Sequence, residues 1–267
     1  MPAQKREGAV APGVAFVTGG ARGLGNAVAV AFAREGARGV VIVDIQDDAT
    51  MDEGKKAVEA YGTECLAIRA DVTQEQAVVK AVAEAVSKFG RIDYAANFAG
   101  IVVSGAMYDL SLEGWEKVIA VNSTGVFLSM KHELKQMMEQ ESLEVESDRP
   151  PQKGSVVNCA SITSIQASAG TGGYAASKHA VLGVTKAAAL DARRHGIRVN
   201  CVSPGFLRTQ LVAGIIKEGG EKSAEKFQAS EARQGRPARF SEIGDAVVLL
   251  STPRMSLVNG HNLVCDG

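Results

Sequence analysis

The chain has 267 residues, a length that fits one large α/β domain as well as two small ones. Hydrophobic residues make up 46% of the chain and charged residues 22%, a balance that argues against wholesale disorder. The formal net charge is −1 and acids and bases are mixed along the chain, so no nucleic-acid partner is expected.

No apolar run approaches the ~20 residues that a membrane-spanning helix requires, and residues 1–8 lack the apolar core of a signal peptide. We therefore expect a cytoplasmic protein without a membrane partner. The four cysteines form no CxxC pair, and three of them lie in apolar runs. This arrangement predicts reduced, buried thiols and no metal site.

Short apolar or β-branched runs alternate with longer amphipathic stretches along the chain. The runs predicted as strands are 14–18, 40–44, 65–70, 92–96, 155–159, 198–202 and 263–265. The stretches predicted as helices are 25–35, 74–89, 115–138, 173–194 and 243–250. Strands that are apolar throughout and separated by helices predict a doubly wound, seven-stranded parallel sheet of the Rossmann type, with helices on both faces.

Two segments interrupt this alternation. Residues 139–153 are polar, rich in glutamate and contain two adjacent prolines, which predicts an exposed loop. Residues 205–240 have mixed character after a predicted strand, which is typical of a substrate loop or lid. Because neither an internal repeat nor an interdomain linker is evident, we expect residues 1–267 to form a single domain.

The first predicted strand runs into Thr-Gly-Gly-Ala-Arg-Gly-Leu-Gly at residues 18–25, and a predicted helix follows. Gly19 permits a sharp turn, Gly23 lets a pyrophosphate approach the backbone, and Gly25 lets the helix pack against the strand. The helix N-terminus offers free N–H groups and the positive end of its dipole to phosphate. The strand–loop–helix context therefore predicts a dinucleotide-binding site rather than a glycine-rich turn.

Asp44 ends the second predicted strand, 19 positions after Gly25. A carboxylate at this point accepts hydrogen bonds from the ribose hydroxyls and repels a 2′-phosphate, which favours NAD over NADP. Arg22 in the glycine turn favours the opposite choice, because a cation there can pair with that phosphate. We give Asp44 more weight because it is expected to face the ribose directly.

Tyr174 and Lys178 lie four residues apart in a stretch predicted to be helical. This spacing places the phenol and the ammonium group on one face of the helix. A free tyrosine has a pKa of about 10, and a neighbouring ammonium group favours the phenolate, so such a pair is suited to proton transfer near neutral pH. A Tyr–Lys pair on a helix is also common as a purely structural feature.

Ser161 follows a predicted strand and precedes Tyr174 by thirteen residues. Its hydroxyl group is expected at the carboxyl edge of the sheet, where ligands bind in open α/β folds. There it can hydrogen-bond a substrate oxygen while Tyr174 exchanges the proton. Ser164 is a nearby competitor for this role.

In these motifs and their order the chain resembles the short-chain dehydrogenase/reductase family, in its compact single-domain branch, over about residues 13–267. The Thr-Gly-x-x-x-Gly-x-Gly cradle of that family matches residues 18–25. Its Asn-Asn-Ala-Gly segment matches residues 97–100, where Phe98 replaces the second asparagine. The resemblance implies four catalytic residues: Asn122, Ser161, Tyr174 and Lys178.

The resemblance also implies a role for each part of the cofactor site. Asn122 holds a water that links Lys178 to bulk solvent, Thr209 bonds the nicotinamide carboxamide, and Val202 lies beside that ring. Asp71 and Val72 flank the adenine. The cofactor-binding residues expected on all these grounds are Gly19, Arg22, Gly23, Leu24, Gly25, Asp44, Ile45, Asp71, Val72, Asn97, Ala99, Gly100, Tyr174, Lys178, Pro204, Gly205 and Thr209.

Together these features predict an oxidoreductase that transfers a hydride between NAD(H) and a secondary alcohol or ketone. The oxidised state of cellular NAD pools favours alcohol oxidation, in which Tyr174 takes the alcohol proton. Apolar side chains in segments 101–107, 162–171 and 206–216 predict a lipophilic or cyclic substrate, although side chains of this kind can also simply pack the lid. They include Ile101, Val102, Val103, Phe206, Leu207 and Leu211.

Two other interpretations keep the fold and change the function: a non-catalytic dinucleotide-binding protein, and a cyclase derived from a reductase. Fold alone does not decide between them. The complete catalytic set favours the enzyme, since a protein that only binds tolerates losses there. By the resemblance, the helical stretches 115–138 and 173–194 pair across a twofold axis, which predicts a homotetramer or homodimer.

Overall fold

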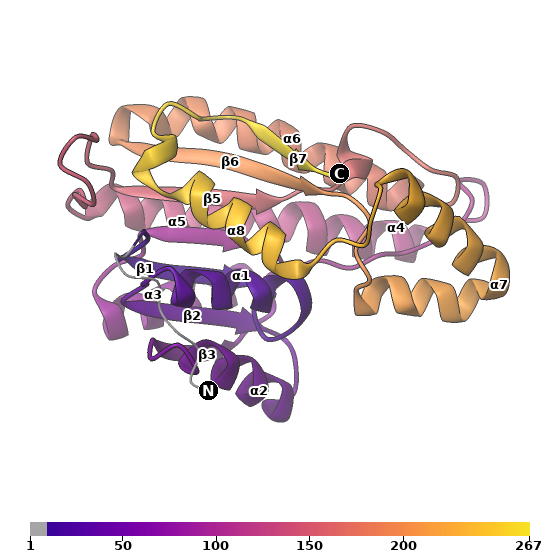
Figure 1. Ribbon diagram of the computed structural model, residues 1–267, viewed down its shortest axis with the longest axis horizontal. Coiled ribbons are helices and arrows are strands. Elements are labelled where there is room, and N and C mark those ends of the chain that lie inside the picture. The colour runs from indigo at the N-terminus through magenta and orange to yellow at the C-terminus, as the bar shows by residue number, and fades with distance from the viewer. Residues whose placement is uncertain (1–9) are drawn as a thin grey trace.

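The computed structural model describes residues 10–267, which form a seven-stranded parallel sheet with helices on both faces (Figure 1). The strands in order across the sheet are β3 (Glu64–Arg69), β2 (Gly39–Asp44), β1 (Val14–Thr18), β4 (Tyr94–Asn97), β5 (Gly154–Cys159), β6 (Ile197–Pro204) and β7 (Asn262–Cys265). The predicted doubly wound Rossmann arrangement is confirmed. Because neighbouring strands are parallel, their carboxyl ends lie along one edge, where the segments that follow them meet.

Alternate residues of the central strands point to opposite faces of the sheet. Val17 packs on the face covered by α1 (Gly23–Arg34) and α8 (Phe240–Ser251). Phe16 packs on the other face, in a cluster with residues of three helices. These are α3 (Glu75–Phe89), α5 (Gly125–Glu139) and α6 (Gly172–Ala192). Figure 1 shows α1 and α8 in front of the sheet and α5 and α6 behind it, which explains why the central strands carry no polar face.

Helix α2 (Asp48–Glu59) is not among the helices that the sequence predicts. Its buried residues, Met51, Gly54 and Val58, have helical spacing, but the helix is polar on average and only two of the three are large apolar side chains. Its start is capped by Asp47, whose side chain accepts the N–H of Thr50 at 2.8 Å. The cap and the spacing together are the sequence signal for this helix.

The segment 205–240 is largely helical and not the irregular loop that its mixed composition suggests. It contains α7 (Gln210–Arg233), which protrudes beyond the carboxyl edge of the sheet (Figure 1, orange). Gly220 breaks the helical path with φ of 63° and ψ of −153°. Glycine adopts this backbone conformation without steric cost, so α7 is two helical pieces joined by a bend.

The loop between α5 and β5 is exposed for most of its length, as predicted. An antiparallel bridge between Leu143 and Gln152 closes it, and Gln152 is buried. All four cysteines are free thiols, and three of them are buried: Cys65, Cys159 and Cys201. Across residues 10–267 no helix is both long and apolar enough to cross a bilayer.

Candidate active site

The turn between β1 and α1 has the geometry of a phosphate cradle. Gly19 and Gly23 have φ of 67° and 59°, in the left-handed region that favours glycine. A Cβ on Gly19 would lie 2.7 Å from the Ala99 nitrogen, and one on Gly25 would overlap the Gly19 oxygen. A Cβ on Gly23 would meet nothing within 4 Å, so this glycine faces open space at the start of α1. Open space beside the N–H groups of a helix N-terminus fits a diphosphate.

Two side chains hold the turn in this shape. Asn26 Nδ2 donates to the carbonyl oxygens of Gly20 and Gly54, at 2.9 and 3.0 Å. Asp44 Oδ2 accepts the N–H of Ala21 at 3.1 Å. A carboxylate oxygen can accept more than one hydrogen bond, so Asp44 can also receive a ribose hydroxyl. Asn26 is not among the residues predicted from the sequence, although its position directly after the last glycine of the cradle is a usable signal.

The other residues expected around the adenosine half follow β2 and β3 or lie at the start of α1. Ile45 is 57% exposed directly after β2, so its apolar side chain is accessible to a ligand. Val72 is buried, and Asp71 accepts hydrogen bonds within its own turn. Leu24 packs against the core and Arg22 is exposed.

The segment after β4 is bonded to the end of β1. Thr18 Oγ1 accepts the N–H groups of Phe98 and Ala99, at 3.2 and 3.4 Å. The same hydroxyl donates to Asn97 Oδ1 at 3.4 Å. The backbone of this segment is therefore held by Thr18 even though Phe98 stands where an asparagine was expected, and the Phe98 ring packs against the core.

Asn122 lies in a π-helical turn, η1 (Ala120–Thr124), between α4 (Leu112–Ile119) and α5. This turn interrupts the single helix that the sequence predicts, and such turns are frequent at functional sites. Asn122 Oδ1 accepts the N–H of Ile101 at 2.9 Å. Its Nδ2 donates to the Ile101 carbonyl at 2.9 Å and to Ser177 Oγ at 3.1 Å. The side chain thus joins the segment after β4 to α6.

Lys178 is buried, and its Nζ donates to the carbonyl oxygen of Cys159 at 2.7 Å. The same nitrogen lies 5.7 Å from the centroid of the Tyr174 ring. A Cβ on Gly100 would be 3.8 Å from this nitrogen and 3.3 Å from Asn122 Oδ1. The structure therefore brings the Tyr–Lys pair, Asn122 and Gly100 together at the carboxyl ends of β4 and β5.

Ser161 follows β5 by two residues and caps the short helix η2 (Ile162–Ser164), which packs on α6. Its Oγ accepts the N–H of Thr163 at 3.2 Å, which leaves the hydroxyl proton free to be donated. Ser164 Oγ donates to the Ser161 carbonyl at 2.5 Å and bonds Ser203 Oγ at 3.0 Å. Since the Ser164 proton is already used within the protein and that of Ser161 is not, Ser161 is better placed than its competitor.

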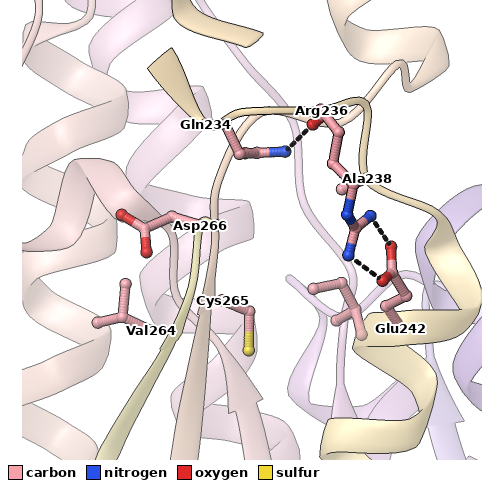
Figure 2. Close-up of a pocket in the computed structure, with 9 residues that line it drawn as sticks. Gln234, Arg236, Ala238, Glu242, Val264, Cys265 and Asp266 are labelled. Carbon is pink, nitrogen blue, oxygen red and sulfur yellow. Dashed lines mark hydrogen bonds and ion pairs between the residues drawn. The ribbon is translucent and has the colours of Figure 1, made fainter. Parts of the chain in front are cut away.

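The turn after β6 is braced from the far end of α7. Gln234 Oε1 accepts the N–H of Phe206 at 2.8 Å, and its Nε2 donates to the Phe206 carbonyl at 3.3 Å. Figure 2 shows Arg236 paired with Glu242 through its two terminal nitrogens, Nη1 and Nη2. The pair lies beside a cavity of about 290 Å³. None of the expected catalytic residues lines this cavity, which lies against the end of β7.

Part of the expected substrate pocket is corrected by the structure. Leu207 is 5% exposed and packs in the core, so it is not available to line the pocket. The Leu211 side chain lies outside the described part of the chain. Thr209 caps α7 by accepting the N–H of Val212 at 3.2 Å, and its hydroxyl proton remains available. Among the side chains that the structure describes, the exposed large apolar ones in or next to the expected lining segments are Met107, Tyr108 and Ile165.

Comparison with known proteins identifies the family. The family model described as enoyl-(acyl carrier protein) reductase matches residues 19–267. The short-chain dehydrogenase fogB of Aspergillus ruber is 41% identical over 271 residues, which cover 96% of each chain. The chain belongs to the short-chain dehydrogenase/reductase family.

Other members extend the comparison to named activities. The (+)-borneol dehydrogenase 2 of Salvia officinalis is 36% identical, with 95% of this chain and 88% of that one covered. The crystal structure of levodione reductase has a TM-score of 0.85 at 34% identity, with 95% and 96% of the two chains covered. Relatives of this short-chain dehydrogenase/reductase are thus oxidoreductases that act on alcohols, and the family generally uses NAD(H) or NADP(H).

Proposed function

We propose that this short-chain dehydrogenase/reductase transfers a hydride between NAD(H) and a secondary alcohol or ketone. The observation that carries the proposal is the hydrogen bond from Lys178 Nζ to the carbonyl oxygen of Cys159. Cys159 precedes Ser161 by two residues, so this bond holds the helix that carries Tyr174 and Lys178 against the strand end that carries Ser161. These groups lie at the sheet edge where open α/β folds bind ligands. The proposed catalytic residues are Asn122, Ser161, Tyr174 and Lys178.

The proposed cofactor is NAD, whose nicotinamide ring supplies the hydride acceptor when it is bound. Support comes from the glycine cradle, where only a residue without a Cβ fits at Gly19, and from Asp44 beside it. Arg22 favours NADP, but it is exposed, whereas Asp44 is bonded to the turn itself through the Ala21 N–H. We therefore give Asp44 the deciding role.

In the proposed oxidation Tyr174, as the phenolate, accepts the proton of the alcohol while the Ser161 hydroxyl group holds the substrate oxygen by donating a hydrogen bond to it. The ammonium group of Lys178, held by the Cys159 carbonyl, places a positive charge near the Tyr174 phenolate that accepts this proton. Asn122 holds the π-helical turn in place through its side-chain bonds, and we assign to it the water that returns the proton to solvent.

The proposed substrate is lipophilic or cyclic. Three exposed apolar side chains in or next to the segments expected to line the pocket support this: Met107, Tyr108 and Ile165. Relatives named for borneol and for levodione are consistent with it.

We propose one domain with a lid at residues 205–240, a cytoplasmic location and a homotetramer or homodimer. Exposed apolar residues on α5, α6 and α8 support association: Phe127, Leu190 and Leu249.

A single experiment tests this function against its alternatives. Purified protein is titrated with NAD and with NADP, and NADH formation is then followed on a panel of cyclic and acyclic secondary alcohols. The proposal expects tighter binding of NAD and stoichiometric NADH formation. Binding without turnover favours the non-catalytic protein, and product formation without NADH favours the cyclase. Tighter binding of NADP with reduction dominating contradicts the proposal.

A further inference from the structure

Glu133 is a carboxylic acid in the core, where a charged group is unfavourable. It lies on α5 on the side that faces the sheet, and its side chain is fully buried. Burial raises its pKa to about 8, against a smaller opposing effect of a hydrogen bond from Asn97. One of its oxygens, Oε1, has no hydrogen-bond partner among the described residues. A buried acid without a cation lowers the stability of the fold unless its neighbours compensate for it.

The bonded oxygen of Glu133 leads directly to the segment that follows β4. Asn97 Nδ2 donates to Glu133 Oε2 at 2.9 Å and to Asn158 Oδ1 at 3.0 Å. With both amide protons engaged on this side, the Asn97 carbonyl oxygen is turned the other way, where it accepts the Thr18 hydroxyl at 3.4 Å. Glu133 therefore helps to fix which way the Asn97 amide points.

The same chain of bonds ends beneath the glycine cradle. Thr18 Oγ1 accepts the N–H groups of Phe98 and Ala99 while its proton is held by Asn97. The Ala99 nitrogen is the atom that a Cβ on Gly19 would approach to 2.7 Å, so the two backbones touch. A shift of the Asn97 amide would therefore be transmitted to the turn at Gly19.

We propose that Glu133 is a positioning residue for the dinucleotide site, where its neutral carboxyl group orients the Asn97 amide and, through Thr18, the glycine cradle. This inference rests on the proposed function, because it assigns the cradle to a dinucleotide. Ionised Glu133 would still accept the hydrogen bond from Asn97, but it would place an uncompensated charge in the core. The hydrogen-bond network would then have to open to admit water or a cation.

The other ionisable groups on elements packed against α5 do not supply that cation. Glu75 on α3 is bonded to Lys131 and His132 at the surface, and Lys178 on α6 is bonded to a carbonyl. Cys201 on β6 has its pKa raised to about 12 by burial, and burial also raises the pKa of Cys159 on β5. Arg198 on β6 is bonded to carbonyls at the end of α8. Six further ionisable side chains on α3 and α6 are exposed to solvent and therefore point away from Glu133: Lys80, Glu84, Lys88, His179, Lys186 and Asp191.

The test is calorimetric titration of the full chain with NAD at about pH 6.5 and about pH 9.5. Glu133→Leu removes the acceptor and is expected to raise the dissociation constant about ten-fold at the lower pH, as when only a tenth of the molecules are competent to bind. Glu133→Gln keeps an acceptor for Asn97 and should bind within about two-fold of wild type there. Ser129→Ala, one turn earlier on α5 at another buried and unpartnered side chain, is the matched control and should bind like wild type.

The pH comparison separates positioning from a merely structural role. Wild-type affinity should fall about ten-fold or more between the two pH values, whereas Glu133→Gln, which has every other ionisable group, should lack this component of the fall. Wild type and Glu133→Gln with the same pH dependence, or Glu133→Leu with wild-type affinity, would overturn the inference while leaving the proposed function intact. If wild type binds neither NAD nor NADP at pH 6.5, both are overturned.

Discussion

Lys178 Nζ and the carbonyl oxygen of Cys159 lie 2.7 Å apart, a hydrogen bond that ties helix α6 to the end of strand β5. The bond uses one of the three protons of the ammonium group and leaves the others free for a ribose hydroxyl or a water. It also fixes how α6 lies relative to the residues that follow β5, and so how Tyr174 lies relative to Ser161. Tyr174 is one helical turn away on α6, and Ser161 is two residues further along the chain from Cys159.

Replacing Lys178 by methionine removes this bond and the positive charge while keeping the length of the side chain. We expect turnover of a secondary alcohol to fall at least about a hundred-fold, because the proton-transfer group loses its electrostatic support. Steady-state kinetics measure the change. Lys186→Met, two turns later on α6 at an exposed position, is the control and should keep wild-type turnover. Near-normal turnover of Lys178→Met would remove the lysine from the mechanism.

Asp44 should decide the choice between the two nicotinamide cofactors. Its carboxylate accepts the Ala21 N–H and lies against the turn that would carry the adenosine ribose. Asp44→Ser removes the negative charge, so we expect NAD binding to weaken about ten-fold and NADP binding to improve. Titration of both cofactors on wild type and variant measures the change. An unaltered ratio of the two dissociation constants would show that Asp44 does not face the ribose.

Arg198 should be one of the most costly residues to remove. Its buried guanidinium donates to the carbonyl oxygens of Leu250 and Thr252 at the end of α8, at 2.7 and 3.0 Å, and to other acceptors. Arg198→Leu leaves these acceptors without partners, and we expect the free energy of unfolding to fall by about 3 kcal/mol or more. Denaturant unfolding measures it. The exposed Arg194→Leu is the control, with an expected change within about 0.5 kcal/mol.

Much of this architecture can be predicted from the sequence because it depends on local pattern. Residues 14–18 are apolar and followed by glycines, and they form β1 as predicted. The four-residue spacing of Tyr174 and Lys178 places both on α6 because helical periodicity is a local property. The start of α6 at Gly172 also lies within one residue of the prediction.

The features that the sequence does not predict depend on contacts between distant segments. The π-helical turn at Asn122 is held by bonds to Ile101 and Ser177, from two other parts of the chain. Glu133 is an unremarkable acid in an amphipathic stretch until α5 packs on the sheet and brings it to Asn97. Helix α7 is not predicted because Gly220 interrupts it and the mixed composition of the helix hides its apolar periodicity.

The stability of the fold should depend on pH through Glu133. Its folded pKa of about 8 lies above the value of about 4.3 expected in an unfolded chain, so between these pH values the folded state holds a proton that the unfolded state has lost. Stability therefore falls as pH rises from about 5 to about 8. Glu133→Gln removes this dependence, and we expect its advantage over wild type to grow by roughly 2–4 kcal/mol over that range.

Urea unfolding of both proteins at pH 5, 6, 7, 8 and 9 measures the dependence. The difference between the two unfolding free energies should increase up to about pH 8 and change little at higher pH, once both the folded and the unfolded chains are ionised at this position. A constant difference across the series would mean that Glu133 titrates alike in both states, with no cost of burying its charge.

The most direct test of the account is Tyr174→Phe, which removes a single hydroxyl group and keeps the ring beside Lys178. Turnover of secondary alcohols and NAD affinity are measured on the same preparation. We expect turnover to fall by about three orders of magnitude, within the usual range for loss of a proton-transfer group, while NAD binds nearly as tightly as in wild type. Turnover within a few-fold of wild type would contradict the assignment of the tyrosine hydroxyl as the proton acceptor.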